Sequence, residues 1–150
     1  MTSIPRAALV LGLAGLIPFL WGAATYVHAP LANWAATTLG TRFVGPFVQL
    51  SYGAIILAFM SGVLWGFATK ATGAQAAMGY TLSVIPALWA FFMTGGGPVS
   101  AGLNLMFGFG GLLILDFAFA RWGLAPPWWM ALRILLTVIV LACLAVGVFI

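Results

Sequence analysis

The chain has 150 residues, 65% of them hydrophobic and only 4% charged, and its formal net charge at pH 7 is +4. Soluble domains carry about 25% charged residues, so a chain this apolar is predicted to lie in a lipid bilayer rather than in water. Its few basic residues stand singly along the chain, and this scatter excludes the basic patch that a nucleic acid would need.

The first apolar segment is predicted to form a membrane helix over residues 5–26. Pro5 suits the first helical turn, where its missing N–H is harmless. Pro18 lies inside the segment and is expected to kink the helix, so a neighbouring helix or water must bond the freed carbonyl. Arg6 followed by an apolar run resembles a signal peptide, but we expect the segment to be retained as a helix. No transit peptide rich in Arg and Ser precedes it, which favours a bacterial chain.

The next segment, HAPLANWAATTLGTRFVG (residues 28–45), is too polar to cross a membrane. Pro30 could start a short helix that lies in the membrane interface with Trp34 as its anchor. A plain loop is the alternative.

The second predicted span covers residues 46–69 and contains a row of small residues at every fourth position. The row, called here the small-residue stripe, consists of Ala54, Ala58, Gly62 and Gly66. Small side chains let another helix approach closely, so the stripe predicts a helix-packing surface.

Three further spans are predicted at residues 75–94, 99–120 and 128–150, with Pro86 expected to kink the first of them. The glycines at positions 95–97 and then Pro98 break the chain after that span. Five spans of about 20 residues match a bilayer core of about 30 Å. The sequence therefore predicts an all-α, polytopic membrane protein with one five-helix transmembrane domain over residues 1–150.

The positive charges predict the orientation of these spans. An N-terminus in the cytoplasm places four basic residues inside and only Arg42 outside, and the opposite topology reverses this count. Because cytoplasmic loops carry an excess of Lys and Arg, the N-terminus is predicted to be cytoplasmic and the C-terminus periplasmic. The four inside residues are Arg6, Lys70, Arg121 and Arg133.

A short internal repeat is also visible. The sequence IPFLW at residues 17–21 resembles IPALW at residues 85–89, and both segments lie in spans that run in the same direction. The repeat is consistent with duplication of a helical hairpin, to which a fifth helix was added. A pocket for a quinone or pigment beside Trp21 and Trp89 is an alternative to simple packing of these rings.

Asp116 is the only acidic residue in the chain, and it lies about one turn from the inner end of the fourth span. Arg133 lies at a similar depth in the fifth span, so the two are expected to form a structural ion pair. The pair would offset the cost of a charge within the bilayer. Arg121 is expected to extend to the lipid headgroups instead. A proton carrier or ion ligand is the functional alternative for Asp116.

Neither a metal site nor an enzyme is predicted. His28 is the only histidine and Cys143 the only cysteine, whereas metal sites generally need several ligands. His28 and Asp116 are expected at opposite membrane faces, which excludes a catalytic triad within one chain. No cofactor is expected.

Four segments, in order, carry a resemblance to a known family. They are PRAALVLGLAGLIPF (5–19), YGAIILAFMSGVLWG (52–66), LSVIPALWA (82–90) and PPWWMALRILLT (126–137). Together they resemble the small integral-membrane family of domain of unknown function 3429, whose animal members are like transmembrane protein 69 of mitochondria. In this family an acid near the end of the fourth helix and a Leu-Arg pair in the fifth recur, here Asp116 and Leu132–Arg133. The resemblance implies a bacterial inner-membrane location and an accessory role beside bioenergetic complexes.

The leading functional prediction is a non-enzymatic accessory or assembly subunit that packs against other membrane proteins and against lipid. Its basis is the scarcity of polar side chains together with the small-residue faces. The alternative is a small transporter or channel that uses Asp116, the two proline-kinked helices and the glycine break at residues 95–97. A dry interior would count against this alternative.

Overall fold

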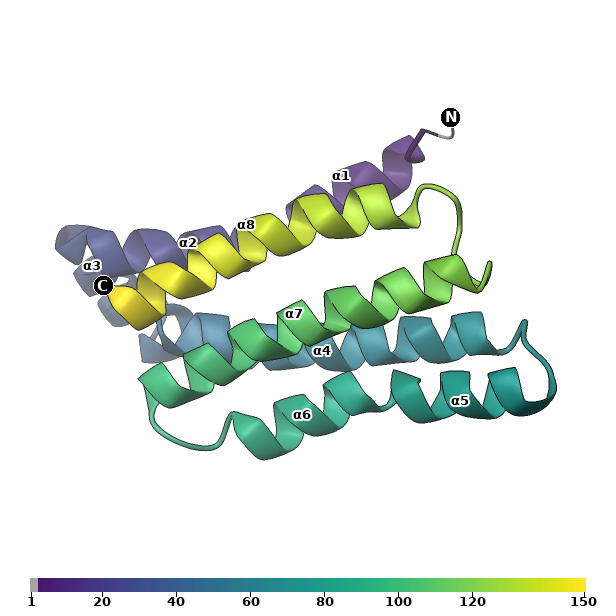
Figure 1. Cartoon of the computed structure of the whole chain (residues 1–150). Helices are drawn as coiled ribbons and strands as arrows, with labels where there is room; N and C mark the ends of the chain where they lie inside the picture. The colour runs from purple at the N-terminus through teal and green to yellow at the C-terminus, as the bar shows by residue number, and fades with distance from the viewer. Residues whose placement is uncertain (1–2) are drawn as a thin grey trace.

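The computed structural model describes residues 3–150, and all regular structure in that range is helical (Figure 1). In chain order the elements are α1 (Arg6–Ala14), α2 (Ile17–Val27), α3 (Ala29–Thr38), the 3₁₀ turn η1 (Thr41–Phe43), α4 (Phe47–Ala68), α5 (Gly73–Ser83), α6 (Ile85–Met93), α7 (Pro98–Arg121) and α8 (Trp129–Phe149).

Five helical segments in the described range are long and apolar enough to cross a membrane. They have 21–24 residues and mean hydropathies of 1.5–2.7, and they are α1 with α2, α4, α5 with α6, α7, and α8. The prediction of an all-helical protein with five helices long and apolar enough to span a membrane is thus confirmed. The segment between the first two spans does form a short helix, α3. Its place in the membrane interface and the orientation of the chain stay predictions.

The spans lie in three tiers in Figure 1, with α1, α2 and α8 uppermost, α4 and α7 in the middle, and α5 and α6 lowest. Helix α7 packs along α8 and α4, and α2 packs against both α4 and α8. Helix α8 therefore connects the first span to the middle of the bundle. The start of α1 and the end of α8 lie at opposite ends, as an odd number of spans requires.

The first and third spans are each interrupted just before a proline. Pro18 and Pro86 lie at the start of α2 and α6, and the preceding helices end at Ala14 and Ser83. A proline ring clashes with the carbonyl one turn earlier and has no N–H to donate. At the second break a neighbouring helix provides a hydrogen-bond acceptor, because the N–H of Ala87 donates to Ser61 Oγ of α4 at 2.8 Å.

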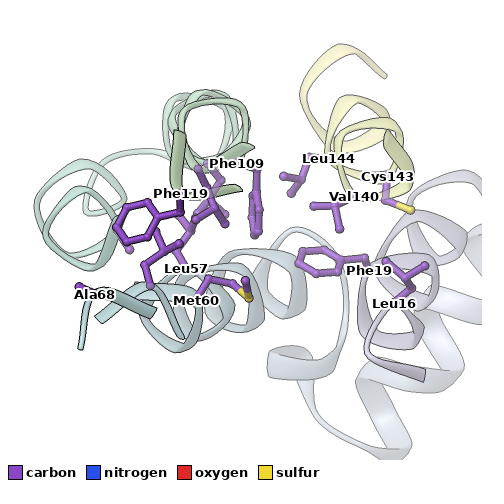
Figure 2. Packing of buried hydrophobic residues seen from close by; sticks show 14 of the residues in the cluster. Leu16, Phe19, Leu57, Met60, Ala68, Phe109, Phe119, Val140, Cys143 and Leu144 are labelled. Carbon is purple, nitrogen blue, oxygen red and sulfur yellow. The ribbon is translucent and has the colours of Figure 1, made fainter. Parts of the chain in front are cut away.

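The core lies where α2, α4, α7 and α8 meet. Figure 2 shows Phe19, Phe109, Val140 and Leu144 pointing into the space between these helices. The rings of Phe19 and Phe109 pack edge to face with centroids 5.8 Å apart, a favourable aromatic geometry. This contact joins the first span to the fourth.

Most of the small-residue stripe lies outside the contacts that α4 makes within the bundle, although Ala54 packs against the core. Ala58, Gly62 and Gly66 are exposed and Ala54 is only half-buried. A Cβ added to Gly62 or Gly66 would have no atom within 4 Å. The row that α4 turns inward is a different one, containing Gly53, Leu57, Ser61, Leu64 and Ala68.

Other glycines make the close helix contacts. A Cβ on Gly108 would lie 2.8 Å from Trp89 Cδ1, and one on Gly79 would lie 3.0 Å from Ala68 Cβ. These contacts bring α7 against α6 and α5 against α4. Lipid is as apolar as the protein interior, so hydrophobicity does not mark which face of a membrane helix points inward.

Candidate functional site

The structure brings Asp116 and Arg133 together across the α7–α8 hairpin. Arg133 Nε donates to Asp116 Oδ2 at 2.8 Å, and Trp129 Nε1 donates to Asp116 Oδ1 at 3.0 Å. Asp116 has no exposed surface and Arg133 is 5% exposed. Both carboxylate oxygens are therefore bonded within the bundle.

The hairpin geometry explains why these side chains meet. Trp129 and Arg133 are four residues apart at the start of α8, so they share one face of that helix. Asp116 lies just over one turn before the end of α7, at a matching depth on the antiparallel neighbour. Lys70 Nζ donates to the carbonyl of Leu124 at 3.2 Å, which ties the hairpin turn to the end of α4.

The ion pair leaves most of the Arg133 guanidinium unused. A guanidinium has five N–H donors, and Nε supplies one of them to Asp116. The terminal nitrogens have no hydrogen-bond partner among residues 3–150. The pairing with Asp116 is therefore not bidentate, and the second carboxylate oxygen accepts from Trp129 instead.

Arg121 takes no part in this cluster. It is exposed at the end of α7, and its guanidinium carbon lies 5.9 Å from the centre of the Phe117 ring. The two arginines of the hairpin thus differ in environment, one facing the interior and the other the outside.

Arg133 also lines a cavity of about 250 Å³ between α1, α2, α4, α7 and α8. Thr137, one turn further along α8, lines it as well and is 1% exposed. Among residues 3–150, Thr137 Oγ1 is the buried side-chain oxygen that lacks a hydrogen-bond partner. The rings of Phe19, Tyr52 and Phe109 form part of the wall.

Gln49 is a buried polar residue that the sequence analysis missed. It is 2% exposed, and its Nε2 donates to the carbonyls of Phe19 and Cys143, each at 3.1 Å. It therefore links α4 to α2 and α8. An amide inside an apolar span was the signal available, because such a group must find a partner in a bilayer.

Thr25 and the two tryptophans of the repeat also bond to the backbone. Thr25 Oγ1 accepts from the N–H of Gly45 at 2.9 Å. Trp21 Nε1 donates to the carbonyl of Phe43 at 2.7 Å, and Trp89 Nε1 donates to that of Asn104 at 2.6 Å. The equivalent tryptophans of IPFLW and IPALW thus each anchor their helix to a later segment.

The remaining candidate residues lie apart from the hairpin cluster. His28 is exposed, and its Nδ1 accepts from the N–H of Leu31 at 3.1 Å, which caps the start of α3. Cys143 is a buried free thiol on α8. Within the described range no three His, Cys, Asp or Glu side chains gather closely enough to hold a metal ion.

Comparisons with known proteins identify the family to which the chain is similar. The model of the family described as protein of unknown function DUF3429 matches residues 4–149. A protein named transmembrane protein 69, from Xenopus tropicalis, is 36% identical over 139 residues. That match covers 90% of this chain and 51% of the relative, so the chain spans about half of the relative's length. No solved structure matches the chain.

Proposed function

Because this chain belongs to the DUF3429 family, we propose that it is a non-enzymatic accessory or assembly subunit of a membrane complex. In this role it binds a transmembrane helix of another membrane protein, and a bioenergetic complex is the expected host. The observation that carries the proposal is a shallow outward groove between α4 and α6. Its lining residues are Ala54, Ile55, Ala58, Ala87, Ala90, Phe91 and Thr94.

The groove is suited to a helix because four of its lining residues are alanines. Lipid tails are as apolar as leucine, so helices associate in a bilayer through close packing rather than through the hydrophobic effect. Small residues allow the backbones to approach closely, and Gly62 continues this surface along α4. The outward part of the stripe thus becomes the contact surface for a partner.

We place the protein in a bacterial inner membrane with its N-terminus in the cytoplasm. Helical spans support the inner membrane, because bacterial outer-membrane proteins are barrels. The positive-inside rule supports the orientation, with four basic residues on the cytoplasmic side and Arg42 on the other. The orientation can be tested with the single-cysteine variants Lys70→Cys and Arg42→Cys, each in a Cys143→Ser background, by labelling their thiols from outside intact cells. Labelling of Lys70→Cys from outside intact cells would contradict the orientation.

The transporter alternative has less support. An ion-carrying Asp116 would need access to water, but its oxygens are bonded by Trp129 and Arg133 and its surface is fully buried. The acid is better suited to holding the α7–α8 hairpin together.

The test is purification of the tagged protein in mild detergent, followed by mass spectrometry of the co-purifying proteins. We expect one membrane protein complex in stoichiometric amount. Ala58→Leu should release it by filling the groove, whereas Gly111→Leu, on an open face of α7, should retain it. Both variants should keep the melting temperature of the wild type. Recovery of the chain alone, as a monomer or homo-oligomer, would contradict the proposal.

A further inference from the structure

The cavity beside Arg133 and Thr137 combines apolar walls with polar groups that the protein does not bond. Thr137 Oγ1 lacks a partner within residues 3–150, and Arg133 uses only Nε in its contact with Asp116. Buried polar groups in native proteins almost always have hydrogen-bond partners, because leaving them unbonded is unfavourable. The hydroxyl of Thr137 is such a buried group, and Arg133, with N–H donors that Asp116 does not use, lines the same cavity. Together they point to a ligand atom that accepts hydrogen bonds from both.

We propose that this cavity binds the carbonyl-bearing part of an apolar membrane molecule. The carbonyl oxygen accepts hydrogen bonds from the terminal guanidinium nitrogens of Arg133 and from the hydroxyl of Thr137. The proposal depends only on the cavity, and it holds whether or not a partner helix occupies the groove between α4 and α6.

The charges favour a neutral ligand over an anion. Asp116 Oδ2 lies 2.8 Å from Arg133 Nε, so the charge of the guanidinium is already balanced. An anion bound here would leave a net negative charge in low-dielectric surroundings, which is strongly unfavourable. A neutral carbonyl uses the free N–H donors without adding charge.

The size and walls of the cavity suit a ring or a short acyl segment. A dry cavity of about 150 Å³ can hold benzene, and this one measures about 250 Å³. Its aromatic wall includes Phe19 and Tyr52, whose ring centres are 5.2 Å apart. At the rim, Leu11 and Phe59 are 72% and 64% exposed, so the opening faces the bilayer.

Two membrane components have this chemistry. One is a quinone, whose ring carries carbonyl groups, and the other is a phospholipid, whose acyl chains begin at ester carbonyls. Both would enter sideways from the bilayer and place their tails among lipid. They can be distinguished because an ether-linked phospholipid has no carbonyl.

The experiment measures the melting temperature of the full chain by circular dichroism in nanodiscs of ether-linked phosphatidylcholine. One series adds decylubiquinone, and the other replaces the lipid with ester-linked phosphatidylcholine. A ligand that binds only the folded state raises the melting temperature, here by about 5 °C. We expect one of the two carbonyl sources to produce this rise in the wild type.

Variants connect the rise to the cavity. Thr137→Val removes the hydroxyl with little change in shape, and it should fold normally and lose most of the rise. Thr137→Ser should keep the rise, and Thr81→Val, which removes an exposed hydroxyl on α5, should leave it unchanged. A rise with quinone assigns a quinone, and a rise with the ester lipid alone assigns a phospholipid. The proposal is overturned if neither source raises the melting temperature, or if Thr137→Val responds like the wild type.

Discussion

Helix α4 carries two rows of residues with similar spacing, and they lie on different sides of the helix. The inner row, which includes Gly53 and Ser61, is buried against the bundle. The outer row is the small-residue stripe, represented by the exposed Gly62. Adjacent rows of one helix are only about 100° apart, and both are compatible with the same apolar sequence. The difference teaches that in a membrane protein small size alone does not identify the buried face.

The α7–α8 hairpin carries one buried and one exposed arginine, so it repeats the contrast between the two rows of α4. Substitutions there are expected to have the largest effect on the free energy of unfolding. Arg133→Ala leaves Asp116 buried without its charge partner and should lower the free energy of unfolding by about 3–5 kcal/mol. Arg121→Ala, at the exposed end of α7, should change it by less than about 0.5 kcal/mol. Unfolding in mixed micelles, followed by circular dichroism, would compare them. Equal stabilities would show that the ion pair is not structural.

The two rows of α4 can be compared with one pair of glycine substitutions. A Cβ at Gly53 would lie 2.9 Å from Cδ1 of Leu105, which is fully buried and has little room to move. Gly53→Val should therefore cost about 1–3 kcal/mol through overpacking. Gly62→Val meets open space and should stay within about 0.5 kcal/mol of the wild type. The same unfolding measurement applies, and a destabilised Gly62→Val would place the outer row inside the fold.

Ser61 of the inner row forms a hydrogen bond to the backbone at the proline break in the third span, and this bond can be removed by substitution. Ser61→Ala removes the hydroxyl that accepts from the N–H of Ala87, and the unbonded donor should cost about 1–2 kcal/mol. Thr81→Val also removes a helical hydroxyl, but Thr81 is exposed and bonds only within its own helix. Its stability should change by less than about 0.5 kcal/mol. Faster hydrogen exchange at Ala87 in Ser61→Ala alone would locate the effect, and unchanged exchange there would contradict it.

The smallest expected effect concerns the tryptophans. Trp89→Phe removes a hydrogen bond to the carbonyl of Asn104 and should cost about 0.5–1.5 kcal/mol. Trp34, which is 53% exposed on α3, is the outward control, and Trp34→Phe should leave the free energy of unfolding nearly unchanged. A comparable loss in both variants would mean that the Trp89 bond contributes nothing beyond the size of the ring.

Much of the architecture could be predicted from the sequence. The five spans were expected close to their observed bounds, because spanning a bilayer requires about 20 apolar residues. The contact between Asp116 and Arg133 was expected because a charged side chain inside a span needs a partner of opposite charge. The α7–α8 hairpin places Arg133 at the same depth as Asp116. The participation of Trp129 was not foreseen, since an indole beside the interface is usually read as an anchor.

The cavity and its polar lining could not have been predicted in the same way. Arg133 and Thr137 share a face of α8, but Tyr52 and Phe19 reach the same space from other spans. The residues next to Thr137 in the sequence give no sign that its hydroxyl lacks a hydrogen bond. That absence is a property of the assembled bundle. Gln49 could have been flagged as an amide in an apolar span, but its two carbonyl partners belong to helices far away in sequence.

The sequence by itself determined three features: that the chain is suited to lipid rather than water, how many spans it has, and which residue pairs with its one acid. Each of these follows from the cost of placing polar groups in a bilayer, and that cost is local to the residue or to its hairpin. Only the tertiary structure decided which face of each helix is buried and where the cavity lies. In lipid both faces of a helix are apolar, so packing between helices makes that choice, and packing depends on segments distant in the chain.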